Sequence, residues 1–352
     1  MRVVLAVDGG NSKTDVALVS EDGRLLSAVR GPTSSHQAVG MVTGMEVLSG
    51  LVAEAVSSAS LDARPDVGVY TLAGADTPPD VRALTDALRR RGLAARDVIR
   101  NDAFGALRAG TDRGWGVVVI CGQGTNAAGI APDGRTIRLD ALGSISGDWG
   151  GGTDVGWEGL AGAVRARDGR GPRTRLERDV PAAFGLRSPA QVTAAMYTGR
   201  IPEKRIGILS PVVFAAADAG DAVARRIVDR LADELVVMAG AMIRRLHLSR
   251  RDPDVVLGGG VFRTREPVFW ERIRDGVATI APAARLVRLS APPVAGAALL
   301  GIDVLIGRTA SPEVGSSVRS GIGAWDARLQ RSVSGPVAAR KRPSSTRSGD
   351  PA

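Results

Sequence analysis

The fold follows from residues 2–20, RVVLAVDGGNSKTDVALVS. An apolar run over residues 2–7 reaches Asp8 and two glycines, and a second strand-like run covers residues 14–20. This order predicts two antiparallel strands joined by a polar turn. The glycines of such a turn let backbone amides approach an anion, and Asp8 is placed to hold hydrated Mg²⁺. A plain hairpin rich in turn residues is the alternative, whereas a Walker A loop is excluded because its spacing and its following helix are missing.

The rest of the first half alternates strands with helices. Residues 24–30 are a third strand, and helical spacing of apolar residues covers 37–60. A buried strand at 67–73, a helix at 80–91 and a short strand at 96–101 follow. The predicted order is therefore β-β-β-α-β-α-β, in which helical crossovers join parallel strands.

A second meander begins at residue 116 and resembles the first. Strand-like residues 116–121 lead through Gly122-Gln123-Gly124 into residues 125–131, and a short strand follows at 135–139. Helical segments dominate residues 153–248. The last elements are a strand at 254–258, a helix near 266–280, a strand at 285–289 and a helix at 293–306. Two such halves predict a duplicated α/β architecture.

Composition limits the class of protein. The 352 residues favour about two domains, and 44% apolar with 24% charged residues is typical of a globular chain. Cys121 is the single cysteine and lies in an apolar strand, so we expect a buried, inert thiol. With only two histidines, one chain cannot build a metal cage of thiolates and imidazoles. No signal peptide or long apolar run is seen, so we expect a cytoplasmic protein with no membrane partner.

The formal net charge is +9, yet the basic residues do not predict a nucleic-acid binder. Only Lys13, Lys204 and Lys341 are lysines among the 46 basic residues, which indicates a general bias towards arginine. Aromatic residues make up 3% of the chain and are not interleaved with a basic stripe, so we expect no nucleic-acid partner. Residues 311–352 are rich in Ser, Pro, Gly and Arg and are predicted to form a disordered tail.

Two further glycine turns follow strands of the second half. Gly122-Gln123-Gly124 leads into Thr125 between two strands, where it is placed to clamp a polyphosphate against the first turn. Gly258-Gly259-Gly260 ends a Val-Val-Leu strand, which suits close backbone approach to the ribose or base of a nucleotide. A bland strand-to-helix turn is the alternative at this third position.

These motifs, together with Asn101-Asp102 and Gly147-Asp148, occur in an order that resembles the actin-like ATPase superfamily. Over residues 1–307 the chain is similar to the BadF/BadG/BcrA/BcrD-type ATPases and N-acetylglucosamine kinases. The resemblance implies two ribonuclease-H-like (actin-like ATPase) domains, with ATP and Mg²⁺ in a cleft between them. We expect these domains at 1–112, with helix 293–307 packed back on it, and at 113–292.

The resemblance also assigns nucleotide and catalytic residues. The family's first phosphate motif is matched by Gly10, Asn11, Ser12, Lys13 and Thr14, with Asp8 as the metal ligand. The second phosphate motif is matched by Gly122, Gly124 and Thr125, and the nucleotide turn by Gly258, Gly259 and Gly260. Asp102 matches the carboxylate that acts as base in the sugar kinases, where it accepts a hydroxyl proton. Its alternative role is an N-cap on a helix at 103–109.

The resemblance places a sugar-contacting loop at 31–36 and further sugar contacts in the second half. The residues expected to bind the sugar are Ser34, Ser35, His36, Asn126, Gly143 and Asp148. The kinases often have Asn where this chain has Ser35, and many members have Glu where it has Trp149. Trp149 is expected either to stack on the sugar or to fill a local core. For His36, a simple hydrogen-bonded loop residue is favoured over a group that polarises a substrate oxygen.

The leading prediction is a homodimeric, ATP-dependent kinase that phosphorylates a hydroxyl of an amino sugar such as N-acetylglucosamine or glucosamine. One alternative is the ATPase that activates 2-hydroxyacyl-CoA dehydratases or benzoyl-CoA reductases, but its intersubunit iron–sulfur cluster needs two cysteines per chain. A nucleotide-dependent sensor is the non-enzymatic alternative, with residues 311–352 recruiting a partner. The presence of Asp102 and both phosphate turns favours the kinase.

Overall fold

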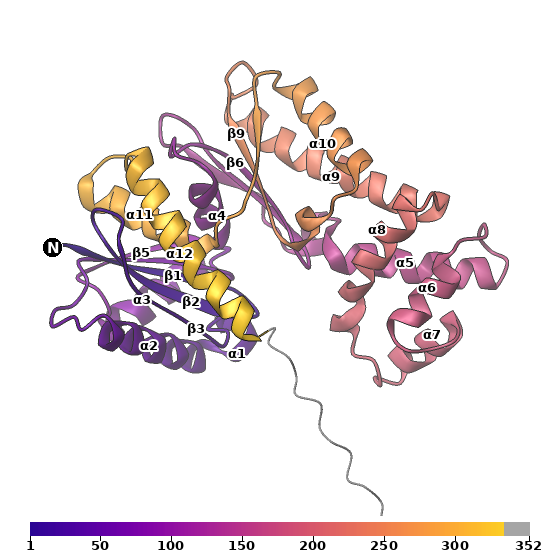
Figure 1. Ribbon diagram of the computed structural model, residues 1–352, viewed down its shortest axis with the longest axis horizontal. Helices are drawn as coiled ribbons and strands as arrows, with labels where there is room; N and C mark the ends of the chain where they lie inside the picture. The colour runs from indigo at the N-terminus through magenta and orange to yellow at the C-terminus, as the bar shows by residue number, and fades with distance from the viewer. Residues whose placement is uncertain (334–352) are drawn as a thin grey trace, which may run out of the picture.

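The computed structural model describes residues 1–333 and contains two five-stranded sheets (Figure 1). The first sheet has the order β3-β2-β1-β4-β5. Its strands are β1 (Val3–Gly9), β2 (Thr14–Ser20), β3 (Leu25–Gly31), β4 (Val67–Leu72) and β5 (Arg96–Asn101). β2 runs antiparallel to β1 and β3, whereas β4 runs parallel to β1 and β5. The carboxyl ends of β1, β4 and β5 therefore meet at one edge of the sheet.

The second sheet has the order β10-β9-β6-β7-β8, which repeats the first when read from β8. Its strands are β6 (Gly116–Cys121), β7 (Thr125–Ile130), β8 (Thr136–Arg138), β9 (Asp254–Gly258) and β10 (Arg285–Arg288). β6 pairs antiparallel with β7 and parallel with β9, as β1 pairs with β2 and β4. The duplicated α/β arrangement predicted from the two meanders is thus confirmed at the level of the sheets.

The two faces of the first sheet are covered by different helices. α1 (His36–Val39), α2 (Met41–Ser58) and α3 (Pro78–Arg91) follow β3 and β4. Leu5 and Val7 pack in a core with residues of α2 and α3, whereas the alternate residues Val4 and Ala6 pack with residues of α11 (Pro293–Ile306). This separation follows from the alternation of side chains along a strand.

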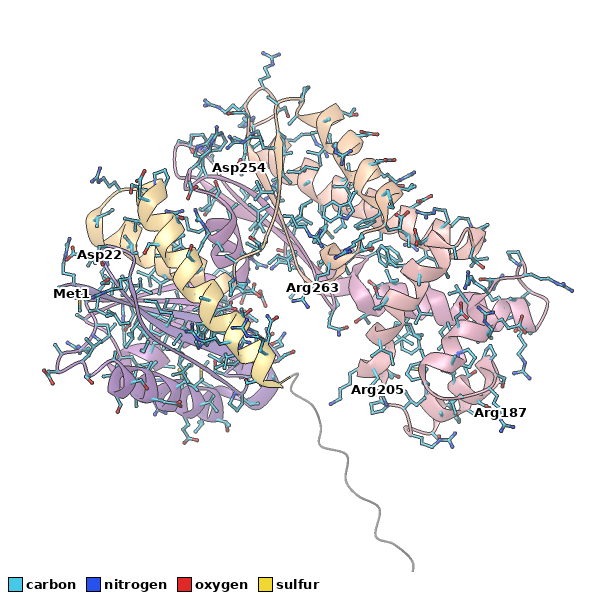
Figure 2. All side chains as sticks on the ribbon, in the orientation of Figure 1. Met1, Asp22, Arg187, Arg205, Asp254 and Arg263 are labelled. Atoms are coloured by element: carbon cyan, nitrogen blue, oxygen red, sulfur yellow. The ribbon has the colours of Figure 1, made fainter. Side chains whose placement is uncertain are left out.

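The helices of the second half form a single large core with the second sheet. They are α5 (Gly151–Arg167), α6 (Leu176–Ala183), α7 (Pro189–Tyr197), α8 (Ser210–Asp218), α9 (Ala222–Arg245) and α10 (Pro267–Ile280), with 3-10 helices η1 (Gly143–Ser146), η2 (Glu203–Leu209) and η3 (Gly260–Arg263). α6 and α7 lie at the end of the molecule farthest from the first sheet (Figure 1). Arg187 and Arg205 mark this end, whereas Arg263 lies near the middle of the molecule (Figure 2).

The helix α4 (Asp102–Gly110) lies between the two sheets, and α11 packs against it from the side of the first sheet. Ala103 and Leu107 of α4 pack against Val118 and Val256 of the second sheet. On its other side α4 crosses α11 so closely that a Cβ on Gly296 would overlap the Gly105 carbonyl oxygen. This contact between helix backbones requires glycine, because any side chain would force the helices apart.

The prediction of a disordered tail at 311–352 is wrong for most of the residues that the structure describes. Residues Pro312–Val333 form a helix, α12, which lies beside α11 on the first sheet (Figure 1). Val318, Ile322 and Trp325 of this helix are buried in the core that contains β1 and α11. Burial of these side chains stabilises the helix, whatever its Ser- and Arg-rich composition suggests. Residues 334–352 lie outside the described residues.

Within residues 1–333, no single helix is both long and apolar enough to cross a membrane. Two consecutive helical segments, Glu203–Asp218 and Ala222–Arg245, have the length and composition of a membrane span only when they are taken together, and the chain bends by 113° between them.

Candidate functional site

The β1–β2 turn is closed by a hydrogen bond from the Gly10 backbone N–H to the Lys13 carbonyl oxygen at 2.9 Å. The Thr33 hydroxyl donates to the Gly10 carbonyl oxygen at 2.8 Å, which ties the turn to the loop after β3. Asn11 and Ser12 are exposed at the tip of the turn. The tip is therefore open to an anion, and phosphate binding there stays a prediction.

Thr14 and Ser34, both expected to bind ligands, also hold these loops together. The backbone N–H of Ser34 donates to the Thr14 hydroxyl oxygen at 2.8 Å, and the Thr14 hydroxyl donates to the Ser34 hydroxyl at 2.9 Å. Both side chains are buried. Their hydrogen-bonding capacity is thus used to fix the loop after β3 against the first turn.

Asp8 pairs across the strands with Asp15 and feels the charges of both Asp15 and Asp102. Burial, and then the negative charges of Asp15 and Asp102, raise the pKa of Asp8 to about 7, although Lys13 and Arg30 act in the opposite direction. A carboxylate in this environment gains from a nearby cation. Mg²⁺ binds oxygen donors and is usually held by one or two carboxylates together with waters and phosphates. The residues present therefore fit a magnesium ion at Asp8.

Asp102 is the first residue of α4, at the end of β5. Asn101, not Asp102, provides the helix cap, because its side-chain oxygen accepts from the Ala103 backbone N–H at 3.1 Å. Burial, and then the charge of Asp76, raise the pKa of Asp102, whereas the Ala103 N–H and Arg138 lower it. A carboxylate whose pKa is raised in a half-buried position is suited to act as a general base.

A polar network that the sequence did not predict centres on Asp76, whose charge acts on Asp102. The Asn101 amide donates to Asp76 Oδ1 at 3.0 Å, and Arg138 Nη1 lies 3.5 Å from the same oxygen. Gln37 Nε2 donates to the other Asp76 oxygen at 3.3 Å. Arg138 comes from the second sheet and Asp76 from the loop after β4, so no local motif joins them.

Three buried polar atoms near this network have no hydrogen-bond partner within residues 1–333: Ser35 Oγ, His36 Nδ1 and Asn126 Oδ1. The amide nitrogen of Asn126 donates to Asn101 Oδ1 at 3.2 Å, which joins β7 to the end of β5. His36 Nε2 lies 3.9 Å from Asp80 Oδ1, so the expected simple hydrogen-bonded histidine is not observed. Buried atoms left without partners are costly, and a polar ligand would satisfy them.

Gly143 and Asp148 belong to one compact loop around η1. The Asp148 backbone N–H donates to the Gly143 carbonyl at 3.1 Å, and the Ser146 hydroxyl donates to the Asp148 carboxylate at 2.5 Å. The next residue, Trp149, carries the Arg230 guanidinium 3.9 Å from its ring centroid and packs against the second core. Of its two expected roles, the structure therefore favours core filling over stacking on a sugar.

The second and third glycine turns lie side by side. The Gly122 N–H donates to the Gly124 carbonyl at 2.9 Å, and the space where a Cβ of either glycine would stand is open. Gly259 has a φ of +109° and lies directly against the Cys121 backbone, a position only glycine fills without strain. Gly258 is buried in β9, so only Gly259 and Gly260 are exposed to a ligand.

A cavity of about 730 Å³ opens between these two turns and α8. Gly122 and Gly260 line it together with Ser210, Phe214 and other residues of η2, α8 and the segment after η3. Its volume lies in the range of small-molecule sites, and it mixes an aromatic ring with backbone polar groups. The sequence did not predict the α8 residues, because nothing in their local pattern differs from an ordinary buried helix.

Comparison with known proteins finds two relatives of this chain. The chain is 31% identical over 264 residues to an N-acetylmuramic acid/N-acetylglucosamine kinase of Clostridium acetobutylicum, covering 74% of this chain and 86% of the relative. It is 26% identical over 319 residues to an N-acetyl-D-glucosamine kinase of Dictyostelium discoideum, covering 86% and 98%.

Solved structures share the fold. A candidate N-acetylglucosamine kinase from Chromobacterium violaceum superposes with a TM-score of 0.65 at 22% identity, covering 85% of this chain and 99% of that one. A ROK hexokinase from Thermus thermophilus does so with a TM-score of 0.52 at 21% identity, covering 87% and 99%. The family model that matches residues 5–301 is the BadF/BadG/BcrA/BcrD ATPase family, and the chain belongs to that family.

Proposed function

We propose that the protein is an ATP-dependent kinase that phosphorylates a hydroxyl of an amino sugar of the N-acetylglucosamine or glucosamine class. The observation that carries this proposal is the set of buried polar atoms without partners on Ser35, His36 and Asn126, of which Asn126 also donates to Asn101, the residue before Asp102. Carboxylate, amide, hydroxyl and imidazole groups suit the paired hydroxyls of a sugar. The names of the two characterised relatives support the same substrate class.

The nucleotide in this proposal spans the three glycine turns. The cavity beside Gly122 and Gly260 is large enough for the adenosine, and the open tip at Asn11 and Ser12 then receives the terminal phosphates. Mg²⁺ held by Asp8 would neutralise phosphate charge when bound. The glycines let backbone N–H groups approach the phosphate oxygens without obstruction by side chains.

Asp102 is the general base in this mechanism. Its carboxylate accepts the proton of the attacking sugar hydroxyl, while that oxygen bonds to the γ-phosphorus and the bond from phosphorus to the ADP oxygen breaks. The products are a sugar phosphate and ADP. Asn101 and Arg138 hold Asp76 beside Asp102, and the Asp76 charge keeps the proton affinity of Asp102 high enough for it to accept the proton.

The proposal also includes two domains, at 1–112 with helix 293–307 packed on it and at 113–292, that close around both substrates. The phosphate turns belong to different sheets, and closure would bring both of them onto one nucleotide. Closure would exclude water from the γ-phosphate. The homodimer implied by the family resemblance stays a prediction.

The experiment that tests the function measures ADP formation with ATP, Mg²⁺ and a panel of sugars, with a no-sugar control. We expect ADP formation that depends on an amino sugar, and mass spectrometry should detect the sugar phosphate. Sugar-independent hydrolysis would contradict the kinase and favour an ATPase. The dehydratase or reductase activator is disfavoured because Cys121, the single cysteine, is buried and its pKa is raised by that burial to about 12.

A further inference from the structure

The buried carboxylate of Asp15 has two cationic partners with different freedom to move. Arg30 donates to both of its oxygens, from Nε at 2.6 Å and from Nη2 at 2.8 Å. Lys13, from the first phosphate turn, also pairs with Asp15. The Asp15 side chain is 0% exposed, whereas 42% of the Lys13 side chain is exposed. Lys13 is therefore the partner that can leave.

Lys13 can leave only if Arg30 stays. An unpaired charge in a buried position is strongly unfavourable, and a bidentate guanidinium satisfies both oxygens of one carboxylate. If Arg30 moved away, Lys13 would be held on Asp15 as the remaining counter-ion. The position of Arg30 thus decides whether the Lys13 ammonium is available to another anion.

The helix α12 holds Arg30 in place. Arg30 Nη2 donates to Asp326 Oδ1 at 2.7 Å, and the guanidinium carbon lies 5.2 Å from the centroid of the Trp325 ring. Both contacts come from the helix that the sequence had predicted as a disordered tail. The same helix is anchored at its other end, where the Ser317 hydroxyl donates to the Gly23 carbonyl at 3.0 Å.

These residues face the nucleotide side of the molecule. A cavity of about 600 Å³ is lined by Lys13 and Arg30 from the first half, Gly259 and Gly260 from the third glycine turn, and Asp326 from α12. The ammonium of Lys13 and the exposed glycines thus border one space. An anion that reaches Gly260 is within the same cavity as the lysine.

We propose that Asp326 and Arg30 are positioning residues for nucleotide binding: α12 fixes Arg30 on Asp15, so that Lys13 can exchange its contact with Asp15 for the β- and γ-phosphates of ATP. This inference rests on the proposed function insofar as ATP is the nucleotide. It assigns α12 a role in the site, since without Asp326 the lysine serves Asp15 instead of the ligand.

The test is a double-mutant cycle on the full-length chain, with Kd measured by calorimetry for AMP and for a non-hydrolysable ATP analogue with Mg²⁺. Asp326→Asn should raise the Kd of the ATP analogue about 3–10-fold and leave that of AMP, which lacks the β- and γ-phosphates, within about twofold. In a Lys13→Met background the same change should have no further effect on the analogue. Glu313→Gln, which neutralises an exposed carboxylate at the start of α12, is the matched control and should bind like the wild type.

Two further variants keep the test decisive if Asp326→Asn does not fold. Asp326→Glu should restore binding, and Arg30→Lys should reproduce the selective loss, because an ammonium cannot bridge both Asp15 oxygens and Asp326. Equal losses for AMP and the ATP analogue, or an undiminished effect of Asp326→Asn in the Lys13→Met background, would overturn the inference. Binding of the analogue by a wild type that phosphorylates no sugar would refute the proposed function while leaving this inference standing.

Discussion

At the scale of single residues, the carboxylate of Asp8, which is placed to bind a cation, lowers the stability of the folded chain when it is charged. Its pKa in the folded chain is about 7 against an ordinary 3.8, since burial and then Asp15 and Asp102 favour the protonated form. Above pH 7 the folded chain must hold this carboxylate charged, whereas the unfolded chain does so freely. The cost to stability therefore grows as the pH rises from about 4 to about 7 and stays constant above.

We predict that Asp8→Asn increases the free energy of unfolding of the ligand-free protein by about 1–4 kcal/mol at pH 8 and by clearly less at pH 5. The difference arises because at pH 5 the wild-type carboxyl is already protonated when folded. Urea denaturation with a chelator present, at both pH values, measures it. If Asp8→Asn instead lowered the free energy of unfolding at pH 8, the conclusion that the charged Asp8 carboxylate destabilises the fold would be wrong.

Asp102→Asn keeps the shape of the side chain but removes its ability to accept a proton. We predict a turnover about 10²–10⁴-fold lower, with nucleotide affinity nearly unchanged, which is the range for loss of a general base. Steady-state kinetics and calorimetric nucleotide titration check the two parts. Near-normal turnover in this variant would exclude Asp102 as the base.

The sequence predicts a part of the site only where one continuous segment forms that part. The glycine turns and Asn101-Asp102 stand at strand ends, so their positions could be predicted from the strands. Asp76 and Arg138 could not, because the two residues that meet at the site come from segments 62 positions apart. The roles of Thr14 and Ser34 as loop contacts were also invisible, since a buried hydroxyl and a ligand-binding one look alike in sequence.

At the scale of elements, the strands and most helices could be predicted because their apolar spacing is regular. The helix α12 is not predicted, because the Ser, Gly and Arg content of this segment is typical of a disordered tail. Its apolar residues nevertheless stand three or four positions apart, which is helical spacing. They are Val314, Val318, Ile322, Trp325 and Leu329. This spacing indicates a helix where the composition alone indicates disorder.

Since α12 is part of a core, we expect it to contribute to stability. Ile322 is fully buried between α12 and the first sheet, so Ile322→Ala should lower the free energy of unfolding by about 2–5 kcal/mol. Ser320→Ala, at an exposed position of the same helix, should change it by less than about 0.5 kcal/mol. Chemical denaturation compares them. Equal stabilities would mean that α12 is only loosely attached.

At the scale of the whole molecule, the proposed mechanism requires the two halves to approach each other around both ligands. We predict that an amino sugar together with a non-hydrolysable ATP analogue gives a smaller radius of gyration than either ligand alone, because in the proposed mechanism Asp102 and Asn126 bind the sugar from different halves. Small-angle X-ray scattering measures this. The same radius in all ligand states would contradict closure.

The placement of α4 has a consequence for how the chain melts. This helix is buried against the second sheet and meets α11, which packs on the first, so neither half keeps a complete core if the other unfolds. Calorimetry should therefore show one endotherm whose van't Hoff and calorimetric enthalpies agree. Two resolved endotherms would mean that the halves melt independently. The proposed base, Asp102, stands at the start of this helix and would therefore be lost only in global denaturation, which would protect the site from partial melting of either half.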